Sequence, residues 1–160
     1  MIEFVLKNRK LRLHPDGIMY ARAHRNGVET KKIIWREIKF SSQNGYISCS
    51  MVVDGERIKL YKHRLVYHAH NQDWDIFDGS MLNMIDHINH DPTDNRIENL
   101  RPVTHQQNNF NRICKGYHRS GNKWRAVIYL DGKRTHIGMF ETEEDARNAY
   151  IKKKLELHLI

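Results

Sequence analysis

Apolar and polar residues alternate over the first sixty residues, in short runs separated by turn signals. Those signals are Pro15-Asp16-Gly17, Asn26-Gly27, Asn44-Gly45 and Asp54-Gly55. Asn-Gly and Asp-Gly favour tight hairpins, because both residues tolerate the backbone that such turns need. The pattern predicts a β-meander over residues 1–61, with its longest hairpin formed by residues 46–53 and 57–61.

The period changes at His63, where HRLVYHAH places its apolar residues on one helical face. Residues 85–88 then predict a strand, a polar loop follows, and residues 96–103 bring the chain back. Thr104 and Gln107 have the spacing of a capping box, which predicts a helix starting there. The outline of residues 62–113 is therefore helix, strand, loop, strand, helix.

Alternation returns in residues 124–130, with Trp124, Ala126, Ile128 and Leu130 on one face. Asp131-Gly132 predicts a turn into a further strand over residues 133–140. Thr142 and Asp145 resemble a capping box before a helix that reaches about residue 158. We expect residues 114–160 to form a three-stranded sheet plus helix, with residues 112–119 as the hinge before it.

The charge of the chain is unevenly distributed. Its net charge is +8, but residues 1–62 carry +7 and residues 112–154 carry +6, whereas residues 63–111 carry −4 and six of the eleven histidines. Basic surfaces attract polyanions, so the two basic arms favour a nucleic-acid partner over a merely soluble basic protein. The fold class that we expect is α+β, in three domains: residues 1–61, 62–113 and 114–160.

The location of the protein is constrained by its apolar runs and its cysteines. No run approaches the roughly 20 apolar residues of a membrane span, and the N-terminus lacks a signal-peptide core. Cys49 and Cys114 have no CxxC partner, so we expect both to be reduced. These features predict a cytoplasmic protein without a membrane partner, located in the host cytoplasm if it is phage-encoded.

The middle segment combines an Asp-His pair, an ENL sequence and a capped helix that carries Asn. HRLVYHAH…IDHINHDPTDNRIENLRPVTHQQNN resembles the HNH nuclease family, in particular phage and intron-borne homing endonucleases whose third signature residue is Asn. His87 lies 12 residues before Asn99 and 21 before Asn108, as in that subgroup. The resemblance implies a ββα-metal core, in which a β-hairpin and a helix hold one divalent metal ion.

By this resemblance, His87 and Asn99 are the catalytic residues. His87 would be the general base, since imidazole titrates near neutral pH, and Asn99 would brace the loop or orient His87. Asp86 and Asn108 would bind Mg²⁺ or Mn²⁺ through hard oxygen atoms. His105 would contact phosphate or support a residue that binds the metal ion or substrate.

Other histidines leave alternatives open. His90 is either a loop residue or a second base. His63 and His70 share a helical face with Tyr67, and we interpret them as packed and hydrogen-bonded side chains, because two imidazoles without a nearby carboxylate make a poor zinc site.

The C-terminal sequence GNKWRAVIYLDGKRTHIGMFETEEDARNAY resembles the three-stranded DNA-binding domain of plant ethylene-response factors, which also occurs in phage homing endonucleases. The resemblance implies a sheet in the major groove. Trp124 could instead be a core aromatic residue. The positions implied to bind DNA are Arg119, Trp124, Arg125, Lys133 and Arg134 and, less directly, Tyr129 and His136.

These features together predict a divalent-metal-dependent endonuclease that acts on double-stranded DNA as a monomer, nicking or cutting a specific site. Two alternatives stay open. One is a non-catalytic, sequence-specific DNA-binding protein on a nuclease-like scaffold, and the other is an RNA-directed or nonspecific nuclease. The joint presence of Asp86, His87 and Asn108 favours the enzyme, because a binding protein has no need of them.

Overall fold

A computed structural model describes residues 1–25, 28–29, 31–111, 115–130 and 132–157. The chain divides into two compact units, Met1–Val103 and Thr104–Ile160. The first unit contains the expected N-terminal arm and most of the expected nuclease segment. The three-domain division at residues 61 and 113 stays a prediction.

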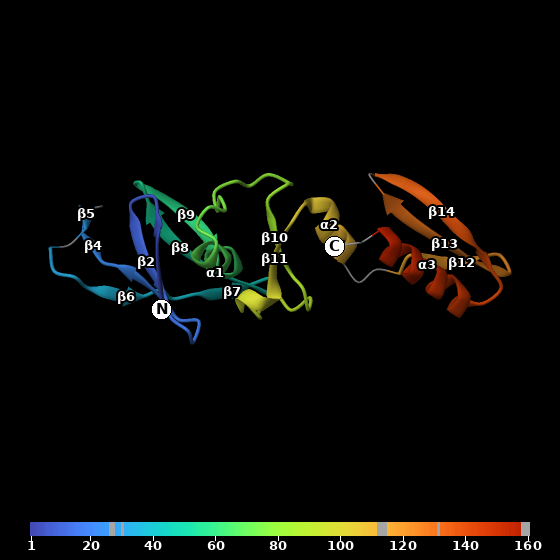
Figure 1. Cartoon of the computed structure of the whole chain (residues 1–160), viewed down its shortest axis with the longest axis horizontal. Helices are drawn as coiled ribbons and strands as arrows, with labels where there is room; N and C mark the ends of the chain where they lie inside the picture. Colours follow the sequence, from blue (N-terminus) through green and yellow to red (C-terminus); the bar gives the residue numbers. More distant parts are fainter. Residues whose placement is uncertain (26–27, 30, 112–114, 131, 158–160) are drawn as a thin grey trace. The chain divides into compact units, whose positions relative to one another are not determined.

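The expected meander forms two larger sheets and a small two-stranded ladder (Figure 1). The first sheet has the order β1-β2-β3-β6, and all of its neighbours are antiparallel. Its strands are β1 (Ile2–Leu6), β2 (Arg9–Leu13), β3 (Met19–Arg22) and β6 (Trp35–Glu37). The small ladder comes between β3 and β6 in the sequence and pairs β4 (His24–Arg25) with β5 (Val28–Glu29). The Asn26-Gly27 hairpin signal lies outside the described residues.

The second sheet has the order β7-β8-β9 and is formed by Ser41–Gln43, Tyr46–Val53 and Glu56–Tyr61. Both of its turns were predicted. Asn44 and Gly45 have φ values of 52° and 82°, and Asp54 and Gly55 have φ values of 50° and 84°. Two successive positive φ values characterise the tight hairpin turn, which explains why Asn-Gly and Asp-Gly occupy these positions.

Helix α1 (Lys62–His70) is the centre of the first unit. Leu65, Val66 and Ala69 are buried, as the sequence predicted. They share one core cluster with side chains of both sheets, including Phe4 from β1 and Met51 from β8. Because the cluster also contains Ile85 and Leu100, the same core holds the hairpin formed by β10 (Met84–His87) and β11 (Leu100–Val103).

The second unit begins with α2 (His105–Asn111) and continues with β12 (Tyr117–Ser120), β13 (Lys123–Leu130), β14 (Lys133–Phe140) and α3 (Glu143–Leu157). The three strands form one antiparallel sheet, and α3 packs on it through Ala146 and Tyr150. The three-stranded sheet plus helix is therefore confirmed. The mixed content of strands and helices is compatible with the α+β class, and the ββα-metal arrangement of the core stays a prediction.

The structure also bears on the cysteines, the expected hinge and the absence of a membrane span. Cys49 is a free, buried cysteine, and burial raises the pKa of its thiol to about 11. Asp131 and the beginning of the expected hinge, residues 112–114 including Cys114, lie outside the described residues. Within the described parts of the chain, no helix has the length and apolar character needed to cross a membrane.

Candidate active site

Strand β10 positions the Asp-His pair. Asp86 faces Arg101 and His87 faces Leu100 in the antiparallel register with β11. Both side chains are buried, with 8% and 6% of their surface exposed. Adjacent strand positions alternate between the two faces of the hairpin, and both faces are covered here, because both residues are buried.

Asp86 has a cationic neighbour. Arg101 donates from Nε to Asp86 Oδ2 at 3.1 Å, and its Nη2 lies 3.1 Å from the same oxygen. A charge-assisted contact of this kind compensates the cost of burying a carboxylate. The contact with Arg101 therefore fixes the position of the Asp86 carboxylate inside the first unit.

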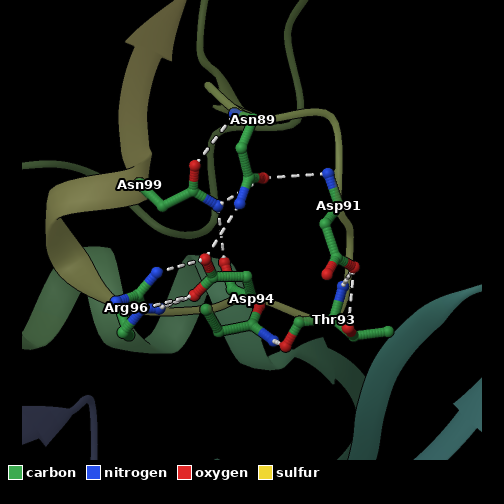
Figure 2. Close-up of polar contacts among 7 residues, drawn as sticks. Asn89, Asp91, Thr93, Asp94, Arg96 and Asn99 are labelled. Atoms are coloured by element: carbon green, nitrogen blue, oxygen red, sulfur yellow. Dashed lines mark hydrogen bonds and ion pairs between the residues drawn. The ribbon is translucent and has the colours of Figure 1, made fainter.

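Asn99 braces the loop that follows β10, as Figure 2 shows. Its Oδ1 accepts the main-chain N–H of Asn89 at 2.9 Å. Its Nδ2 donates to Asn89 Oδ1 at 2.9 Å and to the carbonyl of Asp94 at 2.8 Å. Asn99 itself lies in a short 3-10 helix, η1 (Ile97–Asn99), directly before β11. One buried amide thus fixes both ends of the loop against the hairpin.

The rest of the loop is held by short-range polar contacts. Thr93 donates its main-chain N–H and its hydroxyl to Asp91 Oδ1, at 2.9 and 2.7 Å. The guanidinium of Arg96 donates to both carboxylate oxygens of Asp94 at 2.8 Å, and these bonds hold the pKa of Asp94 well below its usual range (Figure 2). The loop is thus an ordered, hydrogen-bonded turn.

Rings from two other elements lie beside His87. The ring centroid of His63, on α1, lies 5.1 Å from that of His87, and the centroid of Tyr46, on β8, lies 6.2 Å away. Tyr61 stacks on His63 at 5.6 Å. On the loop side, His87 Nε2 lies 3.4 Å from Asn95 Oδ1.

His63 is the residue whose position the sequence interpretation missed. It is packed as expected, but against His87, and its buried Nδ1 has no hydrogen-bond partner among the described residues. Burial, and then the proximity of His87 and Arg64, lower its pKa to about 3. No local pattern could have revealed this contact, because the two histidines are far apart in the sequence. The prediction of a packed side chain is wrong for His70, which is exposed at the end of α1.

The other two candidates of the segment lie on α2. Thr104 and Gln107 form the predicted capping box, in which each main-chain N–H donates to the other side chain. His105 is exposed and Asn108 is half-buried. Both belong to the second unit, whereas Asp86 belongs to the first. A shared role of Asp86 and Asn108 at one metal ion stays a prediction.

The C-terminal candidates fall on two faces of their sheet. Trp124 is half-buried on the core that α3 covers, and Arg119 faces it in the strand register. The packing of Trp124 favours the core interpretation. Arg125 alternates to the opposite face, which Tyr129 and its register partner Arg134 share. Lys133, at the start of β14, is exposed.

Asp86 and Asn108, the two predicted metal ligands, both offer hard oxygen atoms. In the portion of the chain that the structure describes, no group of three His, Cys, Asp or Glu side chains is arranged to hold a metal ion. The carboxylate of Asp86 and the amide oxygen of Asn108 are the oxygen ligands that Mg²⁺ and Mn²⁺ accept together with water.

The segment that carries these residues is similar to a known protein family. Residues 60–110, which span α1, β10, β11 and most of α2, match the family model described as HNH endonuclease. The segment that carries the site is similar to the HNH endonuclease family. We refer to residues 60–110 as the HNH-like segment.

A viral relative supports the same similarity. The chain is 32% identical over 99 residues to an uncharacterized HNH endonuclease, L560, of Acanthamoeba polyphaga mimivirus, and the match covers 58% of this chain. The chain spans about half the length of this relative, since 50% of it is covered. The comparison with solved structures gave no match.

Proposed function

We propose that this chain is a divalent-metal-dependent endonuclease that hydrolyses phosphodiester bonds at a specific site in double-stranded DNA, in the manner of a homing endonuclease. The observation that carries the proposal is the buried Asp86-His87 pair at the end of β10, inside the HNH-like segment. Hydrolysis needs a group that accepts a proton from water and a group that holds a charge-stabilising ion, and this pair supplies one of each.

His87 is the general base in this proposal. The rings of His63 and Tyr46 limit the positions that its imidazole can adopt, and Asn95 lies within reach of its Nε2. Asn99 acts on His87 through the loop, because its amide holds the backbone of Asn89, two residues beyond His87. Asn99 is thus a positioning residue in this proposal, and the proton passes to His87.

Asp86 and Asn108 would hold Mg²⁺ or Mn²⁺. The ion, when bound, supplies Lewis-acid stabilisation of the charge that develops on the phosphate. Arg101 contacts Asp86 Oδ2, so an ion at this carboxylate would share it with the guanidinium or displace it. A site with one ionised carboxylate is weak without substrate, and we therefore expect metal affinity to rise when DNA is present.

The second unit would position the DNA. Its sheet is the part that resembles the ethylene-response-factor domain, and Arg125 and Arg134 lie on the face that α3 leaves open. Arg119, Lys133 and His105 are exposed and would contact phosphates, while the packed Trp124 would support the sheet. With one active site per chain, we propose a monomer that nicks one strand at a time.

The test is cleavage of supercoiled plasmid and phage genomic DNA in the presence of Mg²⁺, Mn²⁺ or EDTA. We expect nicked or linear product with either metal and none with EDTA. His87→Ala should lower the cleavage rate by at least roughly a hundredfold, as the loss of a general base does. His70→Ala is the matched control, because it removes an exposed histidine from the end of α1 and should cut like the wild type.

His90→Ala separates the two interpretations of that residue. His90 is exposed in the loop with a φ of 65°, and its N–H donates to the carbonyl of His87. We expect near wild-type cleavage from this variant, which would identify His90 as a loop residue. Metal-dependent cleavage that survives in His87→Ala contradicts the assignment of the base, and a wild type that binds but never cuts DNA supports the non-catalytic alternative.

A further inference from the structure

The sheet β7-β8-β9 has one buried face and one open face. Cys49, Met51 and Val53 of β8 alternate into the core. The residues between them point outward, together with their register partners on β7 and β9. We call this the open face; its residues are Ser41, Gln43, Tyr46, Ser50, Val52, Arg57, Lys59 and Tyr61, whereas Ser48 has the same register but is buried.

The open face is cationic and rich in hydrogen-bond donors. Residues 41–61 are all described, and no residue of the open face is acidic. Arg57 and Lys59 are exposed, and neither forms a salt bridge with any described residue. Lys59 donates to the amide oxygen of Gln43 at 2.7 Å and lies 5.1 Å from the ring centroid of Tyr61.

The first sheet differs in this respect. Two of its exposed cations face carboxylates: Lys10 lies 3.3 Å from Glu29, and Lys39, just after β6, lies 2.9 Å from Glu37. Arg36 of β6 is exposed as well. Neutralised cations attract a polyanion less strongly than uncompensated ones. Arg57 and Lys59 are thus cations of the second sheet that remain available to a polyanion, whereas Lys10 and Lys39 are neutralised.

The open face is continuous with the candidate active site. Tyr46 is 43% exposed, and its ring lies 6.1 Å from Tyr61 and 6.2 Å from His87. Two cations, several side-chain donors and two aromatic rings therefore lead along one sheet to the residue that we propose accepts the proton. All of these residues belong to the first unit.

We infer that the open face is a binding surface for the phosphate backbone of double-stranded DNA beside the bond that is cut. Arg57 and Lys59 contact phosphates, and Gln43 and Ser50 supply hydrogen bonds. Tyr46 lies at the end of the surface, where the bound DNA backbone approaches His87. Exposed cations with polar donors are the groups that proteins use for such contacts, and they set register without reading sequence. The inference rests on the proposed function for the position of the cut bond.

The test measures binding of the full chain to a fluorescein-labelled random-sequence DNA duplex by anisotropy, with EDTA present so that nothing is cut. The test variant is Arg57→Gln/Lys59→Gln. The matched control is Lys10→Gln/Lys39→Gln, which removes the same charge from ion-paired positions of the first sheet. Each lost phosphate contact lowers the slope of log affinity against log salt by roughly 0.9.

We expect the test variant to lose about 2 units of salt slope and roughly tenfold or more in affinity at about 0.1 M salt, with the control close to wild type. Equal binding by wild type and test variant, or an equal loss in the control, overturns the inference. So does a loss that appears only with single-stranded DNA or RNA probes. Circular dichroism confirms that each variant is folded.

A second measurement needs no variant. Acetylation of the wild type, read by mass spectrometry, should modify Lys59 less when the duplex is present and leave Lys10 and Lys39 unchanged. Unaltered labelling of Lys59 overturns the inference. The plasmid assay with His87→Ala is independent of both measurements, so cleavage without protection of Lys59 refutes the surface, and protection without cleavage refutes the nuclease.

Discussion

His63 is a neutral imidazole buried against His87, and its protonation opposes folding. Its pKa is lowered from 6.5 to about 3, mainly by burial. The unfolded chain therefore binds this proton more tightly than the folded chain does. The stabilisation is fully present above pH 6.5 and is lost progressively as the pH falls towards 3. Acid should thus weaken the fold around His87 well before the carboxylates are titrated.

We expect the free energy of unfolding to fall by about 2 kcal/mol between pH 6.5 and pH 5 through this group. His63→Phe keeps an aromatic ring but has no titrating group, so this part of the pH dependence should disappear. Urea unfolding at the two pH values measures it. His70→Ala is the control and should retain the wild-type slope. A slope that is the same in His63→Phe and wild type would show that the burial of His63 has no such cost.

At the level of elements, the close approach of β12 and α3 depends on Gly116. A Cβ at this position would overlap the ring of Tyr150, which is buried on the sheet. The carbonyl of Gly116 accepts the N–H of Val127 at 2.8 Å, so the backbone has little freedom to move away. An added methyl group must therefore displace Tyr150 from the core.

Gly116→Ala should destabilise the second unit by about 1–3 kcal/mol, as overpacking of a core does. Thermal unfolding followed by tyrosine and tryptophan signals measures this loss. Gly55→Ala is unsuitable as a control because of its positive φ, whereas Gly79→Ala adds a methyl group that meets nothing within 4 Å. Gly79→Ala should melt close to the wild type. An unchanged melting temperature in Gly116→Ala would mean that the backbone before β12 shifts to accommodate the methyl group without loss of stability.

Local signals explain which elements the sequence could predict. The turns at Asn44-Gly45 and Asp54-Gly55 and the caps at Thr104 and Thr142 use interactions between near neighbours, and all four are present. The division of the arm into two sheets could not be predicted, because β3 pairs with β6 across an inserted ladder. The contacts of His87 with His63 and Tyr46 are equally non-local.

At the scale of the whole molecule, each unit has a hydrophobic core of its own. Separate cores allow one unit to open without the other. Gly116→Ala should therefore speed up amide hydrogen exchange only in the second unit, at β13 and α3. The amides of β8 and α1 should exchange as in the wild type. Faster exchange in α1 would instead indicate that the two units unfold cooperatively.

The loop held by Asn99 has a consequence for proteolysis. The side chain of Arg96 is 77% exposed, so trypsin can reach it, but Asp94 and Asn99 hold the neighbouring backbone in a turn. Proteases cut segments that can open. Native protein should resist cleavage after Arg96, and Asn99→Ala should be cut there much faster. A tryptic digest followed by mass spectrometry would thus report whether the loop beside His87 is intact, without any DNA substrate.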